Sequence, residues 1–378
     1  MGAALVDLYW VAGQANLEAL VGQAAILEPG EQERAGRFVR PCDQTLYRAA
    51  HVLLRRSLSR YAEIEPQQWY FVSNPDGRPE IDLSAHPEAQ SLRFNLSHSG
   101  QVACCGITRG AAVGVDVEQE RSIPRVEALA KRFFTPAEAA AVAGLPPEQQ
   151  VGGFLSYWTL KEAALKATGR GLQDGLDAIA FQIHDQTVVA KLPQLARSES
   201  AQGQVLGWRF ALLEIELGLP CALAVALHSA QQMRLCIHRC GCYDAMLNPA
   251  VVASTPGVTV HQGPNLGVVD AWRPLSNGWS GEGHFNLCEK RMTEASSAPN
   301  AVQIQGWIRD YLVETLQVDP KDIDPQRPFT EYGLDSAAVV ILTGDLEEWL
   351  ARDLDPTLLQ DYTTLEVLAN HLSSSDTH

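Results

Sequence analysis

Residues 158–172 read Trp158-Thr159-Leu160-Lys161-Glu162-Ala163-Ala164-Leu165-Lys166-Ala167-Thr168-Gly169-Arg170-Gly171-Leu172. The first part of this run is rich in strong helix formers, and Gly169 and Gly171 are placed to end the helix. Glu162 and Lys166 are four residues apart, so their side chains lie on the same helix face. A carboxylate beside an ammonium can hold a metal ion and protonate a leaving oxygen. The alternative is a surface ion pair that contributes about 0.3–0.5 kcal/mol.

A second cluster lies upstream, where residues 112–118 read Ala-Val-Gly-Val-Asp-Val-Glu. The valines alternate with Gly114, Asp116 and Glu118, which is the period of a strand. The valines would face a core, and the two carboxylates would share the opposite face. Like charges so close favour a cation between them, and Mg²⁺ prefers one or two carboxylates together with phosphate oxygens. The alternative is a solvated strand face.

Polar and basic groups that suit an anion occur earlier in the chain. Residues 93–99 read Arg-Phe-Asn-Leu-Ser-His-Ser, which offers hydroxyls and an imidazole, and Gly77-Arg78-Pro79 is a rigid turn that presents a guanidinium. Two apparent helices carry basic residues at spacings of three or four, on one face each: Arg34, Arg37 and Arg40, then Arg48, His51 and Arg55. Arginine is well suited to bidentate phosphate contacts. For any one arginine the alternative is an ordinary surface position.

In this order, the segments resemble the Sfp-type 4′-phosphopantetheinyl transferases over roughly residues 25–228. The resemblance is carried by residues 94–99, 113–118 and 158–172, with Arg132-Phe133-Phe134-Thr135-Pro136-Ala137-Glu138 between the last two. The family transfers the phosphopantetheine arm of coenzyme A to a serine of an apo carrier protein and releases adenosine 3′,5′-bisphosphate. The resemblance implies an α+β domain of two similar halves that meet near Gly114, with coenzyme A in the cleft between them.

The resemblance also implies roles for individual residues. Asp116, Glu118 and Glu162 would bind Mg²⁺, Glu162 or a water that it orients would take the proton from the serine, and Lys166 would neutralise or protonate the departing phosphate oxygen. The residues expected to contact coenzyme A are Arg48, His51, Arg78, Ser97, His98 and Lys161.

A second domain is indicated far downstream, over about residues 300–373. Residues 332–336 read Tyr-Gly-Leu-Asp-Ser and precede a run of helical periodicity, with an amphipathic helix over 302–318 before it and a short helix over 364–372 after it. This pattern resembles an acyl or peptidyl carrier domain, which implies a small antiparallel four-helix bundle with 4′-phosphopantetheine attached to Ser336. A helix N-terminus favours a phosphate. The alternative is that Ser336 is only an N-cap.

Charge is distributed unevenly along the 378 residues. The chain has 29 Lys and Arg against 45 Asp and Glu, a net charge of −16, and residues 293–378 alone hold 4 bases and 16 acids. We therefore expect an acidic carrier domain that is attracted to a less acidic enzyme domain. Nucleic acid is not an expected partner because no basic stripe occurs.

The sequence also bears on the compartment. No run of 18 apolar residues is present, so we expect no membrane helix. The N-terminus lacks the basic region of a signal peptide, and we expect a cytoplasmic protein with reduced cysteines. Cys42, Cys104, Cys105 and Cys221 read as small buried apolar residues. A zinc site is suggested but disfavoured, because no distant pair of ligands matches its candidates, which are Cys236, His238, Cys240 and Cys242.

The expected domains are a transferase over 1–228, a flexible linker over 229–300 and a carrier over 301–378. The middle segment is rich in Gly, Pro, Ser and Asn without sustained periodicity. Because the sequence from Met292 could begin a separate carrier protein, a fusion of two neighbouring reading frames is a hypothesis.

Three functions remain open. The first is an active transferase that modifies carrier domains, including its own Ser336. The second is a tethered acyl carrier in fatty-acid, polyketide or peptide synthesis that another enzyme loads. The third is a degenerate transferase that only binds coenzyme A, and it is disfavoured because Asp116, Glu118, Glu162 and Lys166 are all present.

Overall fold

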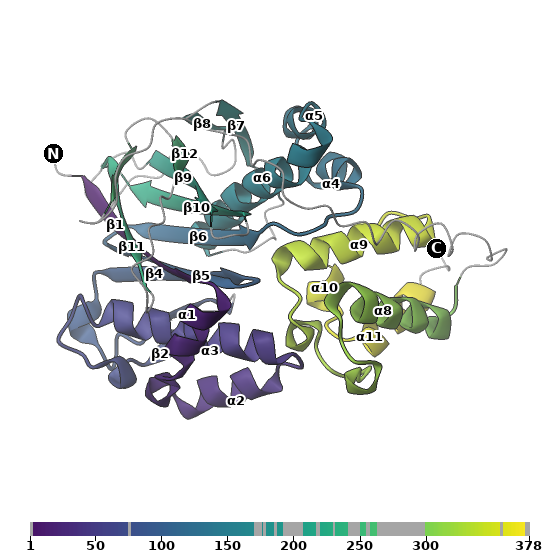
Figure 1. The fold of residues 1–378 in the computed structure, drawn as a ribbon, viewed down its shortest axis with the longest axis horizontal. Coiled ribbons are helices and arrows are strands. Elements are labelled where there is room, and N and C mark those ends of the chain that lie inside the picture. Colours follow the sequence, from purple (N-terminus) through teal and green to yellow (C-terminus); the bar gives the residue numbers. More distant parts are fainter. Residues whose placement is uncertain are drawn as a thin grey trace. The chain divides into compact units, whose positions relative to one another are not determined.

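A computed structural model describes residues 3–74, 77–169, 176, 179–184, 187–191, 207–216, 220–229, 231–240, 250–254, 258–262, 299–355 and 358–374. The described residues up to 262 contain sheets and helices and are called the sheet domain below. Those from 299 onward are helical and are called the helical domain (Figure 1). The expected class, an α+β domain followed by a helical domain, is confirmed.

The sheet domain contains two large sheets within its described residues. The first has the strand order β13-β11-β1-β5-β4, with bounds β1 Ala4–Ala12, β4 Leu92–Ser99, β5 Val102–Arg109, β11 Met233–Arg239 and β13 Val258–Gln262. The second has the order β6-β10-β9-β12-β8-β7, with bounds β6 Ala112–Gln119, β7 Ala180–His184, β8 Thr187–Lys191, β9 Gly207–Glu216, β10 Pro220–Ser229 and β12 Ala250–Ser254. A small ribbon pairs β2 Phe71–Ser73 with β3 Pro79–Ile81.

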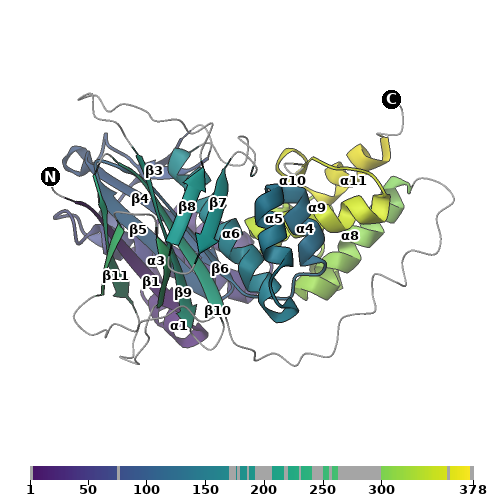
Figure 2. The same cartoon turned by 90° about the horizontal axis from the view of Figure 1, so that it is seen from above.

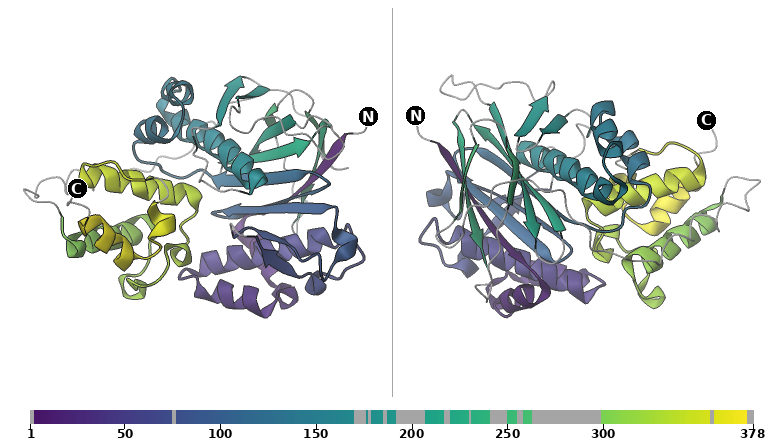
Figure 3. Two further views of the ribbon diagram at one scale, coloured as in Figure 1. Left: turned by 180° about the vertical axis from the view of Figure 1, so that it is seen from behind. Right: turned by 45° about the horizontal axis from the view of Figure 1, so that its top comes forward.

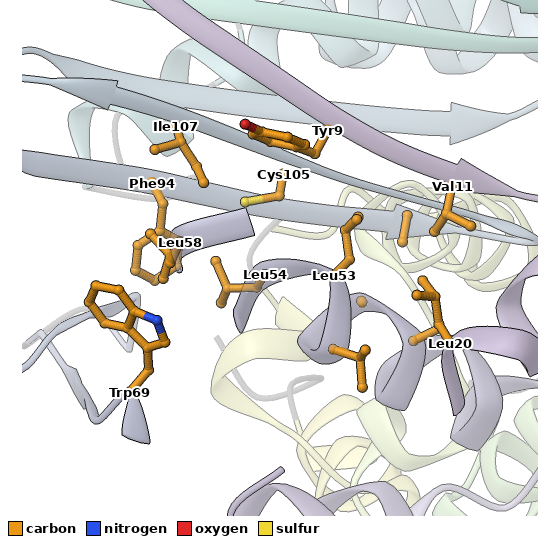
Figure 4. Packing of buried hydrophobic residues seen from close by; sticks show 14 of the residues in the cluster. Tyr9, Val11, Leu20, Leu53, Leu54, Leu58, Trp69, Phe94, Cys105 and Ile107 are labelled. Atoms are coloured by element: carbon orange, nitrogen blue, oxygen red, sulfur yellow. The ribbon is translucent and has the colours of Figure 1, made fainter. Parts of the chain in front are cut away.

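Each large sheet has one long helix against it. The helices of this domain are α1 Gln14–Val21, α2 Pro29–Arg37, α3 Pro41–Leu58, α4 Val126–Phe133, α5 Pro136–Ala143 and α6 Pro147–Thr168. The helix α3 covers the first sheet, where its Leu53, Leu54 and Leu58 pack toward strand residues that include Phe94, Cys105 and Ile107 (Figure 4). The helix α6 runs along the second sheet beside β6 and β10 (Figure 2, Figure 3). The similarity of two halves, which the resemblance implies, stays a prediction.

The strand predicted over 112–118 is confirmed as β6. Its Val113, Val115 and Val117 are fully buried in the core between the two sheets. The alternate residues, Gly114, Asp116 and Glu118, therefore lie on the face that α6 covers. The helix predicted from residues 158–172 is the end of α6, and Gly169 follows it in the left-handed conformation at φ 76°. Gly171 lies outside the described residues.

Gly114 lets the backbones of β6 and α6 come into direct contact. A Cβ atom on this residue would lie 2.0 Å from the carbonyl oxygen of Ala163 and 2.5 Å from the amide nitrogen of Ala167. Both are backbone atoms of α6, so no side-chain rotation could relieve the clash. The absence of a side chain at position 114 thus sets how close α6 lies to the strand that carries Asp116.

Lys161 belongs to the core of the domain, and the contact with coenzyme A that was expected of it stays a prediction. Its ammonium lies 2.9 Å from Glu138 Oε2, and both side chains are completely buried. The ammonium also donates hydrogen bonds to the carbonyl oxygens of Leu176 and Ile179. These three acceptors match the three N–H groups of the ammonium. Since the acceptors lie on α5 and on the chain that leads into β7, Lys161 links both of these to α6.

The boundary that was expected for the start of the linker, at residue 229, lies too early in the chain. Residues Met233–Arg239 form β11, which pairs in parallel with β1 over seven residue pairs. His238 Nε2 lies 2.7 Å from Asp7 Oδ1, so side chains also attach this strand to β1. The strands β12 and β13 fall in the same segment. Its residues 263–298 lie outside the described part of the chain, as do Cys242 and the linker's remaining cysteine, Cys288.

The helical domain has four α-helices among its described residues: α8 Ala301–Leu316, α9 Ser336–Leu350, α10 Leu358–Asp361 and α11 Leu365–Ser374. Their apolar faces meet in one core that includes Ile304, Ile308, Leu342 and Leu368. The side chain of Asn300 accepts a hydrogen bond from the Gln303 amide and caps α8. The predicted four-helix domain is confirmed, with a third helix of only one turn.

Among the described residues, no helix combines the length and the apolar character that crossing a bilayer requires.

Replacing Gly114 with Ala tests the contact between β6 and α6. We expect a loss of about 1–3 kcal/mol in the free energy of unfolding, because the added Cβ would force two backbones apart. The measurement is equilibrium urea unfolding of the full chain. The control is Gly30→Ala, since nothing lies within 4 Å of a Cβ at that position. An unfolding midpoint that is equal in the two variants would contradict the close approach.

The buried pair makes a second prediction. Lys161→Met leaves the Glu138 carboxylate and two carbonyl oxygens without a cation, so we expect about 3–5 kcal/mol of destabilisation. Glu138→Gln combined with Lys161→Met should cost less than the sum of the single changes, because the two groups interact directly. If Lys161→Met kept normal stability but lost coenzyme A binding, the lysine would be a ligand contact instead.

Candidate functional site

The centre of the site is the face where β6 meets α6. Lys166 Nζ lies 2.5 Å from Asp116 Oδ1, and the Asp116 side chain is almost completely buried. Ser97 of β4 joins the same two groups: its hydroxyl donates to Asp116 Oδ1 at 2.9 Å and accepts from Lys166 at 3.0 Å. Three segments that were predicted separately are therefore brought together here.

Glu118 lies two residues farther along the same face. Its carboxylate is buried and accepts a hydrogen bond from the Ser99 hydroxyl at 2.8 Å. Arg121 Nη1 approaches the same oxygen at 3.4 Å. Asp116 and Glu118 are thus adjacent carboxylates, each beside a serine and a cation.

Glu162 lies one turn before Lys166 on α6 and is also buried. Burial by itself lowers the pKa of Lys166, but the nearby carboxylates of Asp116 and Glu162 raise it by more, and the net pKa of Lys166 is raised. The ammonium is therefore a stable positive charge between two acidic groups. Asp116 and Glu162 are buried, and the Lys166 side chain is 28% exposed, so the group is not a fully solvated surface pair.

The guanidinium of Arg78 donates hydrogen bonds to backbone carbonyl oxygens. Its Nη1 donates to the carbonyl oxygen of Lys166 at 2.5 Å, and its Nη2 donates to those of Phe94 at 2.8 Å and Val113 at 3.2 Å. Burial lowers the pKa of Arg78. The arginine therefore ties the end of α6 to β4 and β6, and a contact with coenzyme A stays a prediction.

The basic residues of α3 form a separate group. His51 Nδ1 lies 2.8 Å from Glu31 Oε1, and its ring stacks on Tyr47. Arg55 is completely buried against Glu28 and Glu31. Arg48, on the same helix, is half-buried. Their proposed contacts with phosphate are not tested by this geometry.

Ser97 and His98 lie on opposite faces of β4, because neighbouring residues in a strand alternate. Phe94 and Leu96 have the parity of His98 and pack against the core of α3. Asn95 and Ser99 have the parity of Ser97 and reach toward β6. The motif that was expected to bind one anion is therefore divided between two sides of the strand.

The acidic cluster fits a divalent cation in its donor chemistry. Carboxylate oxygens are the ligands that Mg²⁺ prefers. Asp116 Oδ2 is a buried oxygen with no hydrogen-bond partner in the described structure, and such an atom is costly unless a ligand or water satisfies it. No group of three or more acidic, histidine or cysteine side chains among the described residues is close enough to form a complete metal site.

Ser336 is the first residue of α9, as predicted. Asp335, not Ser336, caps this helix, because its side chain accepts a hydrogen bond from the Ala338 amide at 2.8 Å. Ser336 itself is partly exposed. The alternative role of Ser336 as the N-cap is therefore wrong, because Asp335 occupies that position.

Sequence reasoning did not identify Asn95 or Ser99 as members of the site. A signal for them existed, because Asn95-x-Ser97-x-Ser99 and Gly114-x-Asp116-x-Glu118 are both polar runs with a period of two. Two such runs predict facing polar edges only if the strands are known to be neighbours, and the sequence does not provide that.

Family models match three parts of the chain. Residues 10–107 match the model described as 4′-phosphopantetheinyl transferase, N-terminal, and residues 112–212 match the 4′-phosphopantetheinyl transferase superfamily. Residues 306–372 match the model of the phosphopantetheine attachment site.

Curated proteins that are named as 4′-phosphopantetheinyl transferases also resemble this chain. The 4′-phosphopantetheinyl transferase HetI of Nostoc sp. is 41% identical over 150 residues, which are 39% of this chain and 62% of HetI. The protein slr0495 of Synechocystis sp. is 36% identical over 158 residues, which are 42% of this chain and 63% of that protein. The transferase Sfp of Bacillus subtilis is 28% identical over 170 residues, which are 45% of this chain and 72% of Sfp.

The chain thus spans somewhat less than two thirds of HetI and slr0495. The matched segments contain Asp116, Glu118, Glu162 and Lys166 in one part and Ser336 in another. The chain thus carries two segments that match models of 4′-phosphopantetheinyl transferases, followed by one segment that matches the model of a phosphopantetheine attachment site.

Proposed function

We propose that this protein transfers 4′-phosphopantetheine from coenzyme A to the serine of an apo carrier domain, and that its own Ser336 is one acceptor. The observation that carries the proposal is the buried cluster of Asp116, Ser97 and Lys166 within the matched transferase segment. A carrier domain in the same chain supplies an acceptor of the right kind.

The reaction is a phosphoryl transfer. The serine oxygen forms a bond to the phosphorus that bears the pantetheine arm, and the bond from that phosphorus to the bridging oxygen of the pyrophosphate breaks. Glu162, or a water that it orients, takes the hydroxyl proton. Lys166 neutralises or protonates the departing oxygen, which leaves with adenosine 3′,5′-bisphosphate. Electrostatic stabilisation and positioning are the main means by which proteins accelerate this chemistry.

Mg²⁺ is part of the proposal. The residues that would hold it are Asp116, Glu118 and Glu162, which would have to approach one another around the ion, because the described residues contain no group of three such side chains that is already close enough. The Oδ2 atom of Asp116, which is buried without a hydrogen-bond partner, supports this assignment. When bound, the ion would neutralise charge on the pyrophosphate of coenzyme A. On the side of the protein, Arg48, His51 and His98 are the proposed contacts with the phosphates of coenzyme A.

The two domains suit each other electrostatically. Residues 293–378 have a net charge of −12, which leaves −4 for the rest of the chain. Attraction of this kind raises association rates, and a tether raises the effective concentration of the acceptor. The proposed domain boundaries follow the matched segments, with the transferase extended to include β11. The cysteines at the described positions 42, 104, 105, 221, 236 and 240 are all free, which fits the proposed cytoplasmic location.

Replacing Glu162 with Gln tests the proton acceptor. We expect transfer to a separate apo carrier protein to slow about 10²–10⁴-fold, because the amide cannot accept the proton. Intact-mass spectrometry follows the gain of phosphopantetheine, and coenzyme A binding should be largely retained. The matched control is Glu148→Gln, an exposed position in the first turn of the same helix. Normal turnover in Glu162→Gln would remove this residue from the mechanism.

Replacing Ser336 with Ala tests the acceptor. Purified apo protein incubated with coenzyme A and Mg²⁺ should gain the mass of one phosphopantetheine, and Ser336→Ala should not, while it still modifies a separate carrier protein. Ser374→Ala serves as the control, since that serine is exposed in the same domain.

The result for the wild-type chain separates the candidate functions from one another. A first-order gain in mass that does not depend on protein dilution would show transfer within one chain. If the wild-type chain stayed unmodified while modifying free carriers, Ser336 would not be its own substrate. If it modified neither, the chain would be a carrier that another enzyme loads or a degenerate transferase that only binds coenzyme A.

A further inference from the structure

The edges of the two sheets are joined by side chains instead of a backbone ladder. The strand β4 ends the first sheet and β6 ends the second. The amide N–H groups of Val115, Val117 and Gln119 donate to the side chains of Asn95, Ser97 and Ser99 at 2.8, 3.4 and 3.3 Å. Each pair is separated by 20 residues, so the strands keep one parallel register. These three side chains of β4 are called the polar seam below.

Two rungs of the polar seam have a second contact that repeats. Ser97 donates to Asp116 at 2.9 Å, and Ser99 donates to Glu118 at 2.8 Å. Each hydroxyl also accepts from a cation, Lys166 at 3.0 Å for Ser97 and Arg121 at 3.4 Å for Ser99. The same arrangement of amide, hydroxyl, carboxylate and cation thus occurs twice, two residues apart.

These contacts use the full bonding capacity of both hydroxyls. A serine hydroxyl has one proton to donate and two lone pairs to accept with. Each proton goes to a carboxylate, and each pair of acceptor positions is taken by a β6 amide and a cation. A direct bond from Ser97 to a phosphate would have to replace one of these. The geometry therefore favours a role in which Ser97 orients the carboxylate of Asp116 over the expected contact of Ser97 with coenzyme A.

We infer that Ser97 and Ser99 are positioning residues that fix the carboxylates of Asp116 and Glu118 for a divalent cation. The inference rests on the proposed function for the identity of the cation site. Hydrogen bonds to a charged group are stronger than neutral ones, and they hold the carboxylate in one rotamer. For Asp116 the bond to Oδ1 leaves the buried Oδ2 for the ion. The hydroxyls of Ser97 and Ser99 thus have two roles. They help to join the two sheets, and they hold the proposed metal ligands in fixed orientations.

The test measures metal binding directly. Mn²⁺ is titrated into the full-length protein and followed by electron paramagnetic resonance, with coenzyme A present and with Ser336→Ala as the background so that no self-modification occurs. Ser97→Ala and Ser99→Ala should each weaken Mn²⁺ binding about 10–100-fold, as loss of a bond to a metal ligand does elsewhere. Ser99→Thr keeps the hydroxyl and should restore most of the affinity.

The matched control is Asn95→Ala. Asn95 forms the third rung, and its side-chain oxygen accepts from Val115 as the serines do from their amides. Ser97 and Ser99 lie beside Asp116 and Glu118 of β6, whereas the corresponding β6 residue for Asn95 is Gly114, which has no carboxylate. This variant should lose stability, measured by urea unfolding, yet bind Mn²⁺ as the parent protein does. Should it fail to fold, Asn95→Ser offers a shorter acceptor in its place.

The outcomes are distinct. Unchanged Mn²⁺ affinity in Ser99→Ala, or an equal loss in the Asn95 variant, would overturn the inference, and so would a parent protein that does not bind Mn²⁺. Serine-dependent Mn²⁺ binding in a protein that modifies no carrier would support the positioning role while the proposed transferase function failed. Normal transfer with Mn²⁺ binding that does not depend on the serines would leave the function standing and remove the positioning role.

Discussion

The contact between the backbones of β6 and α6 at Gly114 is the constraint on which the site depends. A Cβ at this position would lie 2.0 Å from the Ala163 carbonyl oxygen, so only glycine permits the approach. The small Ala163 and Ala167 on the helix side complete it. With the helix this close, Lys166 reaches Asp116 at 2.5 Å. Because the interaction of charges weakens with distance and with added water, a helix displaced by even a small residue would hold a weaker cluster.

The polar seam solves a related problem, because a sheet edge inside a folded domain leaves backbone amides that must be paired. The side chains of Asn95, Ser97 and Ser99 pair three of them across the junction. Side chains span a wider gap than a backbone ladder, which leaves room for polar atoms between the strands. Buried charges are tolerated there because each has a partner, and a network of this kind is stabilising only while its members remain satisfied. The buried Lys161–Glu138 pair follows the same rule on the far side of α6.

Much of this arrangement could be predicted from local patterns. The alternation over 112–118 predicted β6, the composition and the glycines around 158–172 predicted the end of α6, and Ser336 was correctly placed at the start of a helix. Cys42 was expected to be buried and is exposed. The other features that local patterns did not predict depend on distant partners. Lys161 is held by Glu138, 23 positions earlier, and by two carbonyl oxygens that follow α6. The strand β11 pairs with β1, more than two hundred residues away, so a segment without sustained periodicity was taken for a linker.

The sequence by itself determined the types of elements, the two domains and the chemical groups at the site, because periodicity, capping and motif spacing are local properties. The tertiary structure alone decided which groups meet. Ser97, Asp116 and Lys166 come from three segments, and their contact requires that β4 lie beside β6 and that α6 pack against β6. Tertiary structure also determines that Arg78 donates hydrogen bonds to backbone carbonyl oxygens. It likewise determines what lies on each face of β4, and so which groups Ser97 and His98 meet. A side chain's role depends on the partners that folding brings within hydrogen-bond distance, and no local pattern specifies those partners.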